Sequence, residues 1–310
     1  MREAVESYCN PSVFETASTA HQLRRMGEIF KQTVWALTRQ VRAGEFVPEA
    51  FEVSFQELTD VADLRMTFAD DAGMNLRGRI DRMDCCKDEG KLYVKVIDYK
   101  SGSTKFDLIR IYQGLELQLM VYMGAGMDWM KQQNPNHEVL PAAVLYYHID
   151  DPVIDIDGDR NMTQEEVEQE LLQSLRPDGL INRDEQVIAH LDKNLEGKSQ
   201  VIPVELKKSG EIYESRSHVA NTEEFAVIEE YVRNQIRYQG RQIYEGVVSV
   251  NPYKDGTQTS CAYCPYASVC GFDARIPGYQ YRRLEHPDKA GIIEQMQIEN
   301  AKSAHLEQGR

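Results

Sequence analysis

The stretch from residue 78 to residue 102 constrains the fold more than any other part of the chain. Two apolar, β-prone runs, at residues 74–83 and 92–99, flank a polar turn that ends at residues 88–90. Runs of this kind around a turn of Asp, Glu and Gly are typical of a β-hairpin. The stretch therefore predicts two paired strands, and the second is predicted to be an inner strand of a sheet.

Three charged residues occupy this hairpin. Asp81 lies on the first strand, and Asp98 and Lys100 follow the apolar run 94–97 of the second. Side chains alternate along a strand, so Asp98 and Lys100 point to one face and Tyr99 to the other. Two carboxylates suit Mg²⁺ or Mn²⁺, and a lysine steadies the nucleophile or the developing charge. The alternative is an exposed surface salt bridge, but an inner strand that ends in these charges favours a metal-dependent site.

Composition sets broad limits. The chain has 310 residues, 42% of them hydrophobic and 27% charged, as is usual for soluble globular proteins. It shows neither an apolar amino-terminal segment nor a run long enough to cross a bilayer, so we expect a cytoplasmic protein without membrane association. The net charge of −15 argues against nonspecific wrapping of nucleic acid, yet a nuclease with a local basic channel is compatible with it.

Further elements follow from hydrophobic periodicity. Residues 19–43 have helical spacing and a basic face, which is either a solvated surface or a contact to phosphates. Residues 51–55 alternate as a strand, residues 107–130 have helical spacing, and residues 140–149 form an apolar run typical of a buried strand. With the hairpin included, the predicted order is helix, three strands, helix, strand.

Three motifs in this order carry a family resemblance: Gly-x-x-Asp-Arg-x-Asp, Asp-Tyr-Lys-Ser-Gly and Gln-x-x-x-Tyr. The chain resembles the RecB-like branch of the PD-(D/E)xK nuclease superfamily, and within it the carboxy-terminal nuclease region of AddAB-type helicase–nuclease B subunits. The resemblance implies an α/β, restriction-endonuclease-like (αβββαβ) core with helical elaborations and a Cys-rich carboxy-terminal segment. The matching residues are Gly78, Asp81, Arg82, Asp84, residues 98–102, Gln118 and Tyr122.

The resemblance also implies roles for residues of the hairpin. Asp81 and Asp98 would bind the metal together with the backbone carbonyl of Tyr99, and Lys100 would be the catalytic lysine. The cofactor would be Mg²⁺ or Mn²⁺.

Two further residues lie on the helix predicted at 107–130. Gln118 and Tyr122 are four residues apart and share a helix face. The resemblance implies that both hold the substrate strand. The alternative is that Tyr122 is a core residue of the apolar stripe and that Gln118 lies at its edge.

The chain departs from the family pattern in two respects. The family usually has a further Gly-x-x-x-His motif on an upstream helix, and this chain lacks it. His21 and Glu28 are the nearest candidates, although a helix-surface role is the better interpretation of each. The helicase-like half of the B subunit is also absent, so we expect either a fragment or a stand-alone relative.

An acidic segment after residue 150 imitates a calcium-binding loop. Position 6 of that template needs glycine for its sharp turn, but Arg160 stands there. Thr163-x-x-Glu166 is an equally good capping box for a helix that follows, so we favour an acidic loop and a helix cap. Template positions 1, 3, 5 and 12 are occupied by Asp155, Asp157, Asp159 and Glu166.

The remaining chain suggests three regions. We expect the nuclease core at residues 1–150, an α/β elaboration at 151–250 and a Cys-rich segment with the tail at 251–310. Helices are predicted at 163–176 and 223–246, with short strands or a meander near 201–206, and the tail from 289 is predicted as an exposed helix or a disordered segment. The scattered histidines His148, His190 and His218 are interpreted as packing or surface residues.

Cys261, Cys264 and Cys270 form a compact cysteine motif. Three thiols so close in a cytosolic chain suggest Zn²⁺ or an iron–sulfur cluster, and three structural thiols without metal are the alternative. The resemblance implies the last three ligands of a [4Fe–4S] cluster whose first ligand lies far upstream. Cys9 is the only distant amino-terminal candidate, so we expect a chain that begins at Met1 to hold the cluster weakly or not at all.

The function expected from these features is Mg²⁺-dependent hydrolysis of DNA phosphodiesters by an exonuclease that acts on single strands. The resemblance implies the nuclease part of a helicase–nuclease in DNA double-strand-break repair, with a helicase partner subunit. Two other classes stay open: a non-catalytic DNA-binding or scaffold subunit, and a zinc-stapled interaction module.

Overall fold

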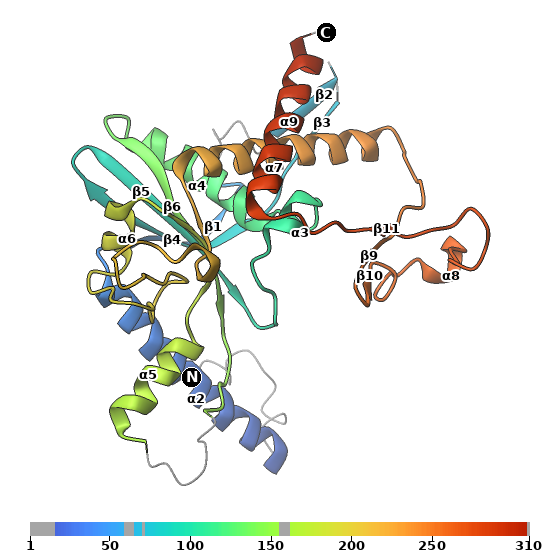
Figure 1. Cartoon of the computed structure of the whole chain (residues 1–310). Helices are drawn as coiled ribbons and strands as arrows, with labels where there is room; N and C mark the ends of the chain where they lie inside the picture. The colour runs from blue at the N-terminus through green and yellow to red at the C-terminus, as the bar shows by residue number, and fades with distance from the viewer. Residues whose placement is uncertain (1–15, 59–64, 70–71, 155–161, 309–310) are drawn as a thin grey trace. The chain divides into compact units, whose positions relative to one another are not determined.

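The computed structural model describes residues 16–58, 65–69, 72–154 and 162–308 (Figure 1). These residues form two compact units, and each is described by itself. The sheet unit falls within residues 1–61, 77–106 and 122–225, and the helical unit within residues 62–76, 107–121 and 226–310. Within the described residues, no helix is long and apolar enough to cross a membrane.

A six-stranded mixed sheet organises the sheet unit, in the order β1-β4-β5-β6-β7-β8. The β1–β4, β4–β5 and β6–β7 pairs are antiparallel, whereas the β5–β6 and β7–β8 pairs are parallel. The predicted α/β class is confirmed. The strands are β1 (Val47–Ser54), β4 (Arg79–Asp88), β5 (Lys91–Lys100), β6 (Glu138–His148), β7 (Asp178–Asn182) and β8 (Val219–Ala220).

The predicted hairpin is the β4–β5 pair, which closes through Glu89 and Gly90 with φ angles of 43° and 84°. Its first strand begins later than predicted. Residues 74 and 75 belong instead to β3 (Ala72–Asn75), which pairs with β2 (Arg65–Ala69) in a separate two-stranded sheet. Gly78 precedes β4 where a Cβ atom would lie 2.9 Å from the Phe55 ring, so only glycine fits there.

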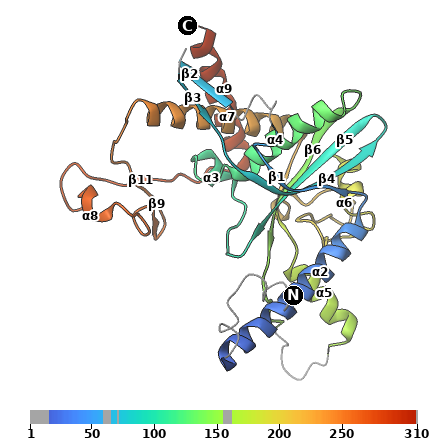
Figure 2. The ribbon, with the colours of Figure 1, turned by 180° about the vertical axis from the view of Figure 1, so that it is seen from behind.

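Helices cover both faces of the six-stranded sheet (Figure 2). On one face, Gly126 of α4 (Gln118–Gln133) packs so closely that an added Cβ would lie 3.0 Å from the Met83 sulfur. On the other face, Leu37 of α2 (Ala17–Ala43) and Leu191 of α6 (Glu185–Leu191) pack against the side chains of β5 and β6. The sheet is therefore the middle layer of three, and both of its faces are apolar along most of their length.

The prediction of one continuous helix over residues 107–130 is wrong. The segment forms two helices, α3 (Leu108–Tyr112) and α4. Gly114 separates the two with a φ of 76°, and the Leu115 amide donates to the Arg110 carbonyl to close the turn. A residue with left-handed backbone angles cannot continue a right-handed helix. The helix is therefore interrupted at Gly114, although the apolar spacing of the sequence continues across it.

The predicted capping box is confirmed at the start of α5 (Gln164–Ser174). The Thr163 hydroxyl accepts from the Glu166 amide, and the Glu166 carboxylate accepts from the Thr163 amide at 2.8 Å. The carboxylates of the calcium-loop template at Asp155, Asp157 and Asp159 lie outside the described residues. Near residues 201–206 the predicted meander consists of two isolated β-bridges, Lys198 with Glu205 and Leu206 with Ile212. The next helices along the chain are η3 (Glu214–Arg216) and α7 (Thr222–Tyr244).

The helical unit corrects the prediction for the tail. Residues 289–308 form a helix, α9 (Lys289–Gln308), which is one of the two predicted alternatives. One side of this helix is packed rather than exposed: Ile292 and Met296 are 2% and 0% exposed. The Asn300 side chain ties α9 to α7 because its amide donates to the Val227 carbonyl at 3.0 Å. The unit also holds a small sheet of order β10-β9-β11, with β9 (Tyr253–Asp255), β10 (Gln258–Thr259), α8 (Ala267–Cys270) and β11 (Arg282–Arg283).

Candidate active site

Asp81 and Asp98 lie beside each other on β4 and β5. The antiparallel register pairs Arg82 with Ile97, and its next step places Asp81 opposite Asp98 on the same face of the sheet. The Asp81 carboxylate accepts a hydrogen bond of 2.8 Å from the Tyr99 amide, which holds the carboxylate against the end of β5. The hairpin therefore brings two of the predicted site residues together.

Lys100 completes this group. Its Nζ lies 2.5 Å from the Asp98 carboxylate and 5.3 Å from the centre of the Tyr146 ring, which belongs to β6. The Asp98 side chain is only 4% exposed, whereas that of Lys100 is 24% exposed. The lysine thus reaches the buried carboxylate from the solvent side.

The electrostatics of the pair favour a bound cation. Burial raises the pKa of Asp98, the hydrogen bond and charge of Lys100 lower it, and the charge of Asp81 raises it again. The net effect is a raised pKa, which means that Lys100 alone does not offset the effect of burial together with the charge of Asp81. Two carboxylates and a nearby backbone carbonyl are hard oxygen donors, so this donor set fits a hard divalent ion.

A buried ion-pair cluster lies on the opposite face of the same two strands. Asp84 is fully buried and accepts from Arg82 at 2.6 and 2.8 Å and from Lys95 at 2.9 Å. Arg82 also reaches the Tyr99 hydroxyl at 3.4 Å. Because side chains alternate, Arg82 and Asp84 cannot join Asp81 in one site; they hold β4 and β5 in register beneath it.

A pocket of about 680 Å³ opens beside the end of β5, from Ser101 onward. Lys105 and Arg176 contribute positive charge to its wall, and Asp150 and Asp178 contribute negative charge. The wall also includes His148, which the parallel register places beside Lys100. The sequence pattern suggests a packing or surface role for His148 and indicates no role for Lys105 or Arg176. The β5–β6 pairing, which is not encoded locally, brings His148 next to Lys100.

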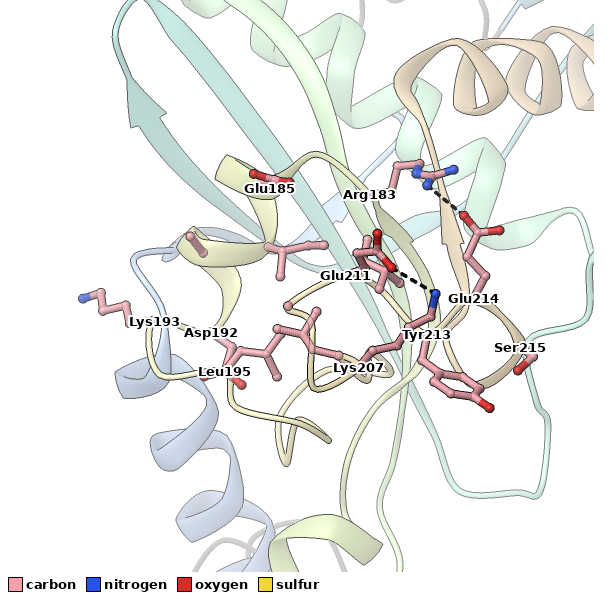
Figure 3. A pocket seen from close by; sticks show the side chains of 15 residues that line it. Arg183, Glu185, Asp192, Lys193, Leu195, Lys207, Glu211, Tyr213, Glu214 and Ser215 are labelled. Carbon is pink, nitrogen blue, oxygen red and sulfur yellow. Dashed lines mark hydrogen bonds and ion pairs between the residues drawn. The ribbon is translucent and has the colours of Figure 1, made fainter.

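A larger pocket of about 920 Å³ lies elsewhere in the sheet unit (Figure 3). Its charged side chains largely pair with each other: Arg183 contacts Glu214 at 2.7 Å and Lys207 contacts Glu211 at 3.2 Å. Such a wall has little charge left to attract a polyanion, so size alone does not make this pocket the substrate site.

The two residues predicted to hold substrate lie near the start of α4. Gln118 is the first residue of the helix. Tyr122 is 7% exposed, and its ring packs edge-on against Phe55 with centroids 5.6 Å apart. This burial is compatible with the core alternative, and a substrate role for either residue stays a prediction.

The candidates for the upstream residue lie on α2. His21 and Glu28 are both exposed, and Glu28 pairs with Lys31 at 2.8 Å. Part of the basic face of this helix is also engaged, because Arg25 contacts Asp151 at 2.9 Å.

The three cysteines of the carboxy-terminal motif lie around α8 in the helical unit. All three are partly exposed, and the Cys264 amide donates to the Cys261 carbonyl at 3.3 Å in the turn between them. Their three sulfurs do not all lie within 4.8 Å of one another. Among the residues that the structure describes, one group of possible metal ligands is that close, and it does not include these cysteines. Cys9 lies outside the described residues.

Comparison with known proteins places this geometry in a family context. The model of the PD-(D/E)XK nuclease superfamily matches residues 1–271. The ATP-dependent helicase/deoxyribonuclease B subunit of Lachnoclostridium phytofermentans is 40% identical over 301 residues, which cover 94% of this chain and 24% of that protein. Proteins of the same name from Thermoanaerobacter sp. strain X514 and Clostridium acetobutylicum are 33% and 36% identical over 89% and 84% of this chain. The chain spans about a quarter of the length of these curated relatives, 24% in the first two and 22% in the third.

Proposed function

Because the chain belongs to the PD-(D/E)XK nuclease superfamily, we propose that it is a metal-dependent deoxyribonuclease whose site is built on Asp81, Asp98 and Lys100. The observation that carries this proposal is the pairing of two carboxylates across β4 and β5 with a lysine 2.5 Å from one of them. A structural salt bridge would need only one of the carboxylates. The second, on the same face, raises the pKa of Asp98 further and favours a cation.

The ion would be Mg²⁺ or Mn²⁺, held by Asp81, Asp98 and the backbone carbonyl of Tyr99. When bound, such an ion supplies an activated water and a Lewis acid for the phosphate oxygens. The contribution of Lys100 comes from its own chemistry: its ammonium group donates hydrogen bonds to the attacking water or to the phosphate as negative charge develops. Hydrolysis then joins the water oxygen to phosphorus, and the leaving oxygen of the broken ester takes up a proton.

We propose that a DNA strand reaches this site through the pocket beside Ser101. Lys105 and Arg176 offer positive charge on its wall, which begins at Ser101, the residue after Lys100. A single strand is the favoured substrate, and exonucleolytic cleavage the favoured mode. Gln118 and Tyr122 are proposed to hold the substrate strand.

The names of the relatives suggest a wider setting. We propose that this chain is the nuclease part of a helicase–nuclease that works with a helicase partner in double-strand-break repair, in the cytoplasm. The cysteines of the carboxy-terminal motif would then hold a [4Fe–4S] cluster with a fourth ligand from elsewhere, for which Cys9 is a candidate.

A non-catalytic DNA-binding subunit is the second candidate. The exposure of His21 and Glu28 favours it, because a catalytic site of this family usually includes a residue from an upstream helix. The same assay separates the two candidates.

Cleavage of end-labelled single-stranded DNA with Mg²⁺, with EDTA as the blank, tests the proposal. Asp98→Ala and Lys100→Met should each reduce the rate by about 100-fold or more, while DNA binding measured by fluorescence anisotropy is retained. Lys91→Met, at the other end of β5, is the matched control and should keep the parental rate. Parental rates in both site variants would place the hydrolytic site elsewhere, and DNA binding without cleavage by the parental chain would favour the non-catalytic candidate.

A further inference from the structure

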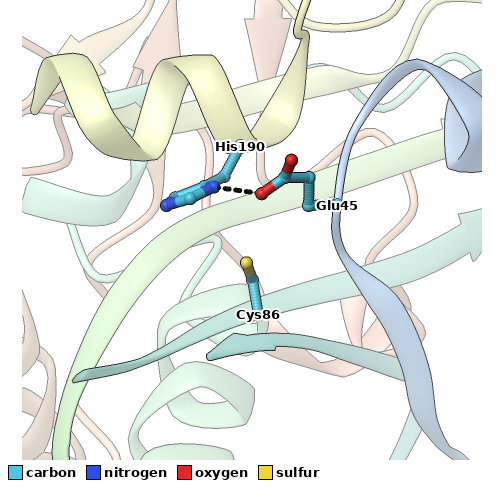
Figure 4. Close-up of side chains that lie close together, drawn as sticks. All are labelled: Glu45, Cys86 and His190. Carbon is cyan, nitrogen blue, oxygen red and sulfur yellow. Dashed lines mark hydrogen bonds and ion pairs between the residues drawn. The ribbon is translucent and has the colours of Figure 1, made fainter. Parts of the chain in front are cut away.

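A second group of ligand-type side chains lies on the face of the sheet opposite Asp81 and Asp98. A carboxylate oxygen of Glu45, the sulfur of Cys86 and a ring nitrogen of His190 lie within 4.8 Å of one another (Figure 4). They come from three separate elements: the connection between α2 and β1, strand β4, and helix α6. Figure 4 shows the Cys86 thiol pointing toward the pair formed by the other two side chains.

The histidine is held between two carboxylates. Its Nδ1 lies 2.7 Å from the Glu45 carboxylate, and its Nε2 lies 3.2 Å from the Asp88 carboxylate. Ionised carboxylates only accept hydrogen bonds, whereas a neutral imidazole has a single N–H to donate. A neutral His190 therefore donates to only one of the two carboxylates. Either an imidazolium, which donates to both, or an ion bound at the second nitrogen would satisfy the other carboxylate. A ligating histidine that donates its remaining N–H to a carboxylate is the usual arrangement around protein-bound metals.

The backbone holds the group in place. The Glu45 amide donates to the His190 carbonyl at 2.7 Å, and the Lys193 amide donates to the Ala43 carbonyl at 3.0 Å. At Gly44, a Cβ atom would lie 2.5 Å from the His190 carbonyl oxygen, so glycine is required for this close approach. Backbone contacts thus hold the end of α6 against the connection between α2 and β1, independently of any side-chain ligand.

We propose that Glu45, Cys86 and His190 bind a divalent ion of the Zn²⁺ class, with Asp88 orienting the histidine through Nε2–H. The mixture of sulfur, nitrogen and oxygen ligands selects a borderline-soft ion over Mg²⁺. Ligands at about 2.0–2.3 Å from zinc lie within roughly 4 Å of one another, and the exposed Glu45 side chain can make the small adjustment that this requires. The ion would join three elements of the sheet unit, and it goes beyond the proposed nuclease function.

Cys86 has to lose its thiol proton to bind the ion. The side chain is 5% exposed, and burial raises the pKa of its thiol. Without an ion, Cys86 is therefore an unreactive thiol, and binding of the ion displaces its proton.

One neighbouring charge opposes the ion. Lys193 Nζ lies 3.6 Å from the other oxygen of Glu45. A lysine that competes with the ion for this carboxylate weakens metal binding, so Lys193→Ala should tighten it several-fold. If Glu45 and His190 formed only a salt bridge, Lys193→Ala would have no such effect.

Co²⁺ is the probe, because a cobalt–thiolate bond gives a sulfur-to-metal absorption band in the near ultraviolet. The Co²⁺ titration is done in a background in which Cys261, Cys264 and Cys270 are replaced by serine, so that their thiols cannot contribute. The catalytic carboxylates offer no sulfur and add nothing to the band. We expect about one thiolate-bound ion per chain.

In this background, Cys86→Ser should abolish the band and Cys85→Ser should leave it intact, because Cys85 faces the other side of β4 beside Met130. Glu45→Gln changes an exposed side chain, so its folding is secure, and it should weaken binding at least tenfold. Zn²⁺ should also raise the melting temperature of the background chain and not that of its Glu45→Gln variant. A band that survives Cys86→Ser, or the absence of a band in the background chain, would overturn the proposal.

Discussion

The ion-pair cluster beneath the active site allows a quantitative prediction for Asp84→Asn. Asp84 is fully buried and is the one carboxylate that contacts both Arg82 and Lys95 among the described ion pairs. The substitution keeps the size of the side chain but leaves two buried cations without a counter-charge. Removal of one partner from a buried pair costs about 3–5 kcal/mol. For a chain of this size, that loss lowers the melting temperature by roughly 10 °C.

The pH dependence follows from Lys95, which can lose its proton, whereas Arg82 cannot. Burial lowers the pKa of Lys95 in the folded protein, and the charge and hydrogen bond of Asp84 oppose that effect. In the variant this opposition is gone, so the folded chain releases the Lys95 proton at a pH where the unfolded chain still binds it. Stability then rises with pH up to the unfolded-state pKa of lysine, about 10.4. The deficit of the variant should therefore narrow as the pH is raised from neutral.

Urea unfolding, followed by the fluorescence of Trp35 and Trp129 in the sheet unit, measures this prediction. The double variant Asp84→Asn/Lys95→Met should be more stable than Asp84→Asn alone, because it removes one stranded cation. Asp151→Asn breaks an exposed ion pair with Arg25 and, as the matched control, should cost less than about 1 kcal/mol. A loss below about 1 kcal/mol for Asp84→Asn, or a double variant no more stable than the single one, would refute the reasoning.

Three further predictions concern the sheet and its site. Asp98→Asn should raise the melting temperature in metal-free buffer at neutral pH, because the ionised Asp98 carboxylate, whose folded-state pKa is raised, lowers stability. This gain in melting temperature should vanish as the pH falls through that pKa, and a gain that is the same at all pH values would contradict the prediction. Gly179→Ala places a Cβ 2.0 Å from the Val144 carbonyl oxygen and should cost about 3 kcal/mol or more in urea unfolding, whereas Gly102→Ala, in open space, should change stability by less than about 0.5 kcal/mol. If Tyr122 contacts substrate, Tyr122→Phe should reduce DNA cleavage by up to about tenfold at an unchanged melting temperature; a lowered melting temperature with normal activity would support the core alternative instead.

Local pattern was sufficient where the structure depends on neighbours in sequence. The hairpin follows from two β-prone runs around one turn, and the common face of Asp98 and Lys100 follows from the two-residue period of a strand. The helix cap at Thr163 likewise needs only residues within one turn. These features are encoded by residues that contact each other across short loops, so the sequence predicts them without knowledge of the rest of the fold.

Where local pattern failed, a backbone conformation or a distant contact prevailed. The apolar spacing continues across Gly114, but its left-handed backbone divides the helix into α3 and α4. The tail resembles an exposed helix by composition, yet the burial of Ile292 and Met296 makes α9 part of the core of the helical unit. Periodicity records which faces are apolar but carries no information on what covers them.

The sequence by itself determined the hairpin, the two carboxylates and the lysine on it, and the family to which the chain belongs. Only the tertiary structure decided that β6 runs parallel to β5, which places His148 beside Lys100, and that α6 returns to β4, which places His190 above Cys86. The physical reason is that strand order and helix docking are chosen by the free energy of burying whole faces against each other. That choice depends on residues far apart in the chain, and no local motif specifies it.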